Sequence, residues 1–171
     1  MRAAAALAAV VLVAVAQVTV APLFPIAGAV PEFVLLGLTL IAAFGSPTAV
    51  MVLTPLAAVA AGFLSDRSPG LMLVGYLPLL PVGVGIEGAP APLNHYLRTL
   101  GMMLATGAWL RAVLALGAVA GGAEPALGPM LTDVILPGMF LDLVLLTVVY
   151  IPLRLAGIPG RGMTLQRSRY Y

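Results

Sequence analysis

Charged side chains are too sparse in this sequence to cover the surface of a water-soluble domain. Of the 171 residues, 62% are hydrophobic and only 8% are charged, whereas a soluble domain carries about 25% charged residues. Long apolar runs alternate with short turns rich in Pro and Gly. A bilayer crossing needs about 20 mostly apolar residues in a helix. The sequence therefore predicts a single integral membrane domain.

The apolar runs predict an all-α membrane protein that forms a bundle of six transmembrane helices within residues 1–156. Their ends are set by prolines and glycines, because proline cannot continue a helix without losing a hydrogen bond. A cytoplasmic, arginine-bearing tail follows at residues 157–171. The six expected spans are residues 3–21, 32–45, 48–64, 71–86, 98–120 and 131–155.

The first apolar run has some features of a secretory signal peptide, since Arg2 precedes it and Ala14-Val15-Ala16 resembles a cleavage site. We expect a retained span instead, because the run continues through Val20 and Ala21. Six spans put both termini on the same side, and that side collects most of the arginines. Because arginine accumulates in cytoplasmic loops, we expect both termini in the cytoplasm.

Two charges fall in the middle of expected spans, Arg111 in the fifth and Asp142 in the sixth. With a rise of about 1.5 Å per residue, they lie roughly 14 Å and 16 Å from the external ends of their helices. Neighbouring antiparallel helices would therefore bring them together, and an unpaired charge at that depth is costly. We predict an Arg111–Asp142 ion pair. It serves either as a structural link between the two helices or as a polar site for a ligand or partner.

Four further charged groups lie near expected span ends. Glu32 begins the second span, Asp66 and Arg67 share an external turn, and Asp133 lies near the outer end of the sixth span. A helix N-terminus favours a negative charge, so we expect capping or interface charges here. Glu32, Asp66 and Arg67 are also candidate partner contacts. His95 falls in a polar stretch between spans, where we expect a solvated side chain.

The residues that usually carry catalysis are absent or badly placed. The chain has no cysteine, and its serines fall in turns or in the tail. It has no Gly-rich phosphate loop and no Gly-x-Ser-x-Gly turn, and its one histidine has no second ligand at metal spacing. We therefore expect no enzyme, cofactor or metal site. A net charge of only +2 also gives no reason to expect nucleic acid.

Small residues recur at helical spacing and form a narrow face on some spans. Such faces let helices approach closely, which drives association in lipid. The face serves either the internal packing of the bundle or the docking of a partner helix. The candidates are Ala4 and Ala8 in the first span, and Gly101, Ala105, Ala108 and Ala112 in the fifth.

Composition and motifs leave two classes of function. One is a non-catalytic membrane scaffold, and the other is the substrate-binding membrane subunit of a transporter. A vitamin-binding subunit should gather polar and aromatic groups near its outer face, and Trp109 is the only tryptophan. We therefore favour the scaffold. Lipid and a second copy of the chain are further candidate partners.

Several segments of the chain resemble the rod shape-determining protein MreD family. In the first half these are Gln17-Val18-Thr19, the run Pro31-Glu32-Phe33-Val34-Leu35-Leu36 and the run Ala61-Gly62-Phe63-Leu64-Ser65-Asp66. The last span, from Leu136-Pro137-Gly138 to Pro152-Leu153-Arg154, is also similar. The resemblance covers residues 17–76 and 131–155. It departs where Glu32 replaces the usual aspartate and Asp142 the expected asparagine.

The resemblance implies a place in the bacterial inner membrane and a function in lateral growth of the bacterial cell wall. MreD-like proteins bind the bitopic membrane protein MreC and work with MreB filaments, RodA and a penicillin-binding protein. The resemblance also implies a fold similar to the six-helix substrate-binding subunits of energy-coupling-factor vitamin transporters. Such a subunit is the alternative function, and Ala4 and Ala8 would then be its docking residues.

Overall fold

The computed structural model describes residues 2–25, 29–81, 92–123 and 127–157, and these residues form helices and connecting turns without β-strands. Three helices are long and apolar enough to cross a membrane: Pro47–Leu64, His95–Ala120 and Met130–Leu155. Three more apolar helices are shorter than this. The all-helical character expected from the sequence is therefore present, while length and composition alone mark three crossings rather than six.

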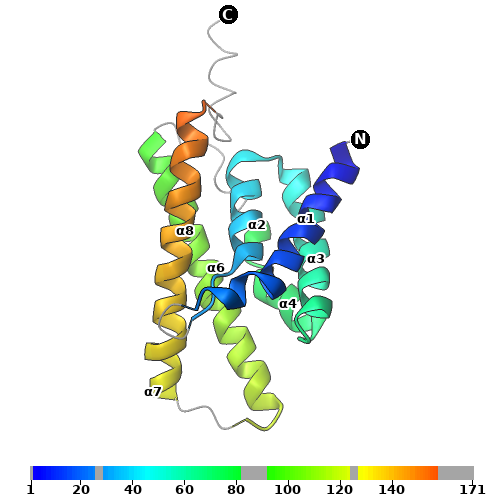
Figure 1. Ribbon diagram of the computed structural model, residues 1–171, viewed down its shortest axis with the longest axis vertical. Helices are drawn as coiled ribbons and strands as arrows, with labels where there is room; N and C mark the ends of the chain where they lie inside the picture. The colour runs from blue at the N-terminus through cyan, green and yellow to red at the C-terminus, as the bar shows by residue number, and fades with distance from the viewer. Residues whose placement is uncertain (1, 26–28, 82–91, 124–126, 158–171) are drawn as a thin grey trace, which may run out of the picture.

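The helices pack side by side and form a bundle (Figure 1). The start of α1 and the end of α8 lie at one end of the molecule, the upper end in Figure 1. In chain order the elements are α1 (Arg2–Thr19), η1 (Ala21–Leu23), α2 (Phe33–Phe44), α3 (Pro47–Leu64), α4 (Pro69–Tyr76), α6 (Pro92–Ala120), α7 (Leu127–Pro129), η2 (Met130–Ile135) and α8 (Leu136–Leu155).

Helix α2 is the centre of the bundle, because it contacts α1, α3, α6 and α8. Its 12 residues span only about 18 Å, which is short of the roughly 30 Å hydrocarbon core of a bilayer. Apolar side chains point outward from it on several sides, as expected for a helix enclosed by others. Its buried residues are Val34, Leu35, Leu36, Leu38, Thr39, Ala42 and Ala43.

A short helix inside a bundle must begin inside the bundle, and the backbone N–H groups of its first turn then need partners other than water. Gln17 of α1 provides one set. Its Oε1 accepts hydrogen bonds from the N–H groups of Phe33 and Val34, and its Nε2 donates to Pro31 O at 2.9 Å. The side chain of Glu32, at the N-cap position, makes no capping bond. Gln17 therefore fixes α1 to the start of α2.

Two expected span boundaries differ from the structure. The expected span 71–86 begins earlier, at Pro69, and is interrupted by a turn at Leu77 and Pro78 before helical geometry resumes as far as Pro81. The expected span 98–120 also begins earlier, at Pro92. Proline is favoured in the first turn of a helix, where its missing N–H has no partner to lose. Residues 82–86 and the tail from 158 onward lie outside the described residues.

The expectation of a solvated His95 in a loop is wrong. His95 lies in α6 and is fully buried, with Nε2 3.1 Å from Ala43 O and Nδ1 2.7 Å from the hydroxyl oxygen of Tyr150. Since a carbonyl can only accept, Nε2 carries the proton, and in the neutral imidazole Nδ1 then accepts from the Tyr150 hydroxyl. The end of α2, the start of α6 and the end of α8 are thereby joined. The early start of α6 at Pro92 is what carries His95 into the bundle.

Replacing Gln17 with an apolar residue should destabilise the bundle strongly, although the substitution changes no charge. Gln17→Leu keeps the side-chain size but leaves the Phe33 N–H and the Pro31 carbonyl without their partner. Each buried group left unsatisfied costs about 1–3 kcal/mol. We expect a clear fall in the thermal unfolding midpoint of the full chain in detergent. Thr19→Val is the matched control, because the Thr19 hydroxyl is exposed and bonds only within α1. Equal midpoints for the two variants would contradict the role given to Gln17.

Candidate functional site

The structure contains the ion pair expected between the fifth and sixth spans. Arg111 Nη2 lies 2.7 Å from Asp142 Oδ2, and both side chains are buried, with 9% and 2% exposed. The Arg111 Nη1 group also donates to Gly107 O at 3.3 Å. Arg111 is thus held to its own helix α6 and to α8 at once. Burial makes this pairing obligatory, because either charge alone would be uncompensated.

Two glycines make room for the guanidinium group. A Cβ atom at Gly138 of α8 would lie 2.6 Å from Arg111 Nη2 and 2.8 Å from Nε. At Gly107 of α6 a Cβ would lie 3.0 Å from Arg111 Nη1 and 3.3 Å from Leu35 Cδ2. The planar guanidinium therefore lies directly against the α8 backbone at Gly138. The Gly107 contact follows from helical spacing within α6, but the Gly138 contact joins α6 to α8, and spacing along one helix could not reveal it.

Asp142 has a second role, which the sequence did not indicate. Its Oδ1 accepts a hydrogen bond of 3.1 Å from the backbone N–H of Glu32. Asp142 of α8 therefore caps the same helix start as Gln17 of α1. Glu32 was expected at the external end of the second span, but this bond places it at the depth of the ion pair. The reason is that α2 begins inside the bundle.

A cavity of about 530 Å³ lies beside this charged cluster. Its walls come from the segment before α2, the turn between α3 and α4, helix α6, and the η2–α8 helix. Glu32, Arg67 and Arg111 supply its charged side chains, and Ser68 adds a hydroxyl. Its apolar lining includes Leu71, Leu114, Met130 and Val134. The size lies within the usual 300–1,000 Å³ of small-molecule pockets.

The wall contributed by residues 130–135 is a π-helix, a conformation seen frequently at functional sites. The backbone N–H of Leu136 bonds to Leu131 O, five residues earlier. Pro137 has no N–H for the carbonyl four residues before it, which lets the preceding turn widen. Asp133 lies on this segment and is exposed, as expected. Met130, Val134 and Ile135 turn toward the cavity.

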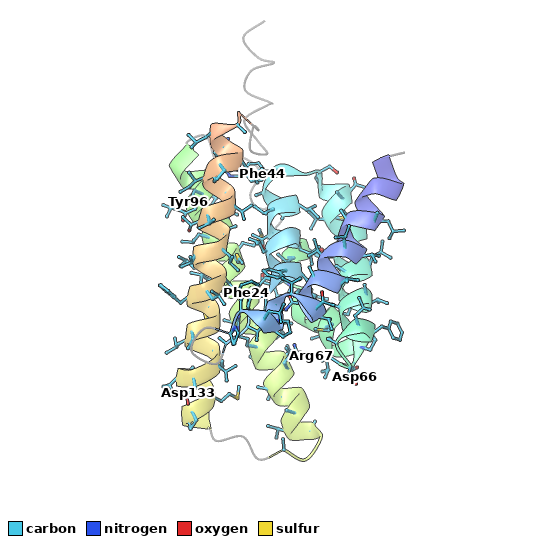
Figure 2. All side chains as sticks on the ribbon, viewed as in Figure 1. Phe24, Phe44, Asp66, Arg67, Tyr96 and Asp133 are labelled. Carbon is cyan, nitrogen blue, oxygen red and sulfur yellow. The ribbon has the colours of Figure 1, made fainter. Side chains whose placement is uncertain are left out.

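The two charges of the α3–α4 turn are placed differently with respect to the cavity. Figure 2 labels both in the lower half of the molecule, whereas Phe44 and Tyr96 are labelled in its upper half. Both are exposed, and Asp66 adopts a positive φ of 56°, a conformation that Asp tolerates better than most residues. Only Arg67 lines the cavity. Asp66 shapes the turn that presents Arg67.

The small-residue candidates are mostly on the outside of the bundle. Gly101, Ala105 and Ala112 are exposed along α6, and Ala108 is half-buried. On α1, Ala8 is exposed, and the side chain of Ala4 lies outside the described part of the chain. Three of the four positions on α6 therefore face away from the other described helices, which favours docking over internal packing.

Among the described residues, no three His, Asp or Glu side chains gather closely enough to hold a metal ion. Comparison with protein-family models, with curated proteins and with solved structures gives no significant match for this chain. What the fold and the site define is an all-helical protein with apolar helices long enough to span a membrane, built around a buried ion pair and a charged cavity.

Sequence reasoning missed Gln17 as a structural residue, and it missed the cavity. For Gln17 a signal was present, since an amide inside a long apolar run needs a hydrogen-bond partner. Its partner could not be named, because the bonded groups are backbone atoms of another segment. For the cavity no signal was present, since its walls come from four separate parts of the chain.

Breaking the buried ion pair from one side should be costly. Asp142→Leu leaves the Arg111 charge without its carboxylate and the Glu32 N–H without its acceptor. Loss of one partner of a buried pair costs about 3–5 kcal/mol. The double variant Arg111→Met with Asp142→Leu removes both charges and should cost less than the sum of the two single variants. Unfolding free energies of the four proteins in detergent measure this. A strictly additive result would contradict the coupling.

Replacing Gly138, the α8 glycine beside Arg111, with alanine should change stability in the direction opposite to that usual for a helix. Gly→Ala in a helix normally stabilises by about 0.5–1 kcal/mol. Gly138→Ala should destabilise instead, because its Cβ would overlap the pinned guanidinium. Gly101→Ala is the matched control, since its Cβ would meet nothing within 4 Å, and it should be neutral or stabilising. Thermal unfolding of both variants tests this, and a Gly138→Ala variant as stable as the control would refute the close contact.

Proposed function

We propose that this chain is a six-helix protein of the bacterial inner membrane with both termini in the cytoplasm. The three long apolar helices supply three crossings, and the shorter apolar helices α1, α2 and α4 supply the others. A short helix can serve as a crossing when its backbone ends are capped by neighbouring helices, as at the start of α2. The start of α1 and the end of α8 lie at one end of the bundle, which agrees with an even number of crossings.

The function we propose is a non-catalytic scaffold of the MreD type. It binds MreC and helps to couple MreB filaments to RodA and a penicillin-binding protein during cell elongation. The observation that carries the proposal is the meeting of Gln17, Pro31–Phe33 and Asp142 in one hydrogen-bonded cluster. These residues come from the separate segments that carry the resemblance to the MreD family. Their shared role in this cluster gives one physical reason why these separate segments carry the resemblance.

The exposed small residues of α6 are the proposed docking face for the transmembrane helix of MreC. Gly101 and Ala105 lie on the outside of the bundle, so a second helix could approach the α6 backbone closely there. Close packing of this kind drives helix association in lipid. Helix packing of this kind does not need polar side chains around the contact, so small residues such as Gly101 and Ala105 are sufficient for it.

A substrate-binding subunit of an energy-coupling-factor transporter is the second candidate. The observation that favours it is the cavity with Glu32, Arg67 and Arg111 in its wall, since a substrate-binding subunit needs a pocket with polar groups. In that function Ala8, which is exposed on α1, would contact the coupling membrane protein.

Identification of the proteins that co-purify separates the two candidates. The full chain carries a C-terminal tag and is extracted gently from native membranes. Recovery of an MreC-like bitopic protein with cell-wall synthases supports the scaffold. Recovery of ATPase subunits with a coupling membrane protein overturns the scaffold and supports the transporter subunit.

Bulk added to the α6 face should reduce recovery of the bitopic partner. Gly101→Leu and Ala105→Leu would hold a partner helix away from α6, and we expect at least a fivefold loss, which is about 1 kcal/mol. Val59→Leu on the exposed side of α3 is the control, because α3 does not share the proposed face. Partner recovery is quantified against the amount of tagged chain. Equal losses from the α6 and α3 variants would place the interface elsewhere.

A further inference from the structure

The charged groups around the cavity are not all used by the fold. Arg111 makes two of the hydrogen bonds described above, and a guanidinium has five N–H donors. Arg67 and the carboxylate of Glu32 line the same cavity, and neither side chain has a hydrogen bond or ion pair with any described residue. Two arginines, one of them paired with Asp142, and one carboxylate thus surround a space of about 530 Å³.

The side chain of Arg111 is held in one orientation in the cavity wall, which suits it to bind a ligand. It is only 9% exposed, and the Asp142 carboxylate, the Gly107 carbonyl and the bare backbone at Gly138 fix its orientation. A guanidinium held in this way loses little further freedom when an oxyanion binds to it. Arg67 approaches the same cavity from the α3–α4 turn, so an oxyanion inside could contact both arginines.

The rest of the cavity is suited to a molecule with an apolar part. Leu71, Leu114 and Val134 line it, and Leu131 and Val134 on η2 are about half exposed, at 51% and 48%. The apolar wall therefore continues onto the outer surface of the helix that would face lipid. A ligand with its polar group between the arginines could extend an apolar chain along η2.

Glu32 further restricts the ligand. Its carboxylate can only accept hydrogen bonds when ionised, so it favours a ligand with an N–H or O–H donor close to its oxyanion. An amino-phosphate or hydroxy-phosphate headgroup has both features. A quaternary ammonium headgroup has the phosphate but no donor.

We infer that this cavity binds the phosphate headgroup of a lipid-like amphiphile, with the phosphate at Arg67 and Arg111, an amine or hydroxyl at Glu32, and the apolar chain along η2. The inference goes beyond the proposed scaffold function and does not depend on the partner proteins. The same oxyanion chemistry would accept free phosphate, so the experiment must separate the two sources.

The test uses the purified full chain in a nonionic detergent and measures ligand binding by native mass spectrometry. The probes are phosphatidylethanolamine, phosphatidylcholine with the same acyl chains, and inorganic phosphate. We expect phosphatidylethanolamine to bind about tenfold more tightly than phosphatidylcholine, the usual scale for a hydrogen bond to a charged group. Binding of inorganic phosphate with equal or higher affinity would overturn the amphiphile.

Two variants locate the site, and a third is the control. Arg67→Gln should weaken phosphatidylethanolamine binding about tenfold, and Glu32→Gln should remove its advantage over phosphatidylcholine. Neither side chain supports the fold through a hydrogen bond or ion pair in the described part of the chain, so both variants should fold. Arg98→Gln makes the same charge change on the exposed surface of α6, about 20 Å away along the helix, and should leave binding unchanged. Equal effects of Arg67→Gln and Arg98→Gln would overturn the cavity as the site.

Discussion

The capping of the first turn of α2 is the interaction on which the rest of the bundle depends. This short helix begins among other helices, where water cannot satisfy its free N–H groups. Gln17 reaches them from α1 and Asp142 reaches them from α8. The two caps fix three helices relative to one another. They also bring a carboxylate to the centre of the bundle, and a carboxylate at that depth requires a cation.

Arg111 meets that requirement, and its position has consequences for the neighbouring space. Its guanidinium lies against Gly138, where no side chain intervenes, and Arg111 also lines the cavity. The residue that neutralises Asp142 therefore also forms part of the cavity wall. A scaffold can use such a cluster for stability alone, but the additional charges of Arg67 and Glu32 serve no hydrogen bond or ion pair among the described residues.

Much of the architecture followed from local sequence rules. The depth of Arg111 and Asp142 along their helices predicted their pairing, because helical rise is nearly constant. Pro47 and the turn at Asp66 marked helix ends correctly to within about a residue. His95 and Glu32 were misplaced for different reasons. The helix α6 begins six residues earlier than expected, which takes His95 out of the expected loop. The helix α2 begins almost where expected in sequence, but it is short and its start lies inside the bundle, which takes Glu32 away from the external end.

The sequence by itself determined that the chain is helical and apolar, and that two opposite charges lie at matching depths. These properties depend on composition and on positions within single helices. Only the tertiary structure decided that Gln17 and Asp142 cap α2, that Gly138 receives a guanidinium, and that a charged cavity opens beside them. The physical reason is that each of these features joins backbone or side-chain atoms from segments far apart in the chain, and no local rule specifies which segments meet.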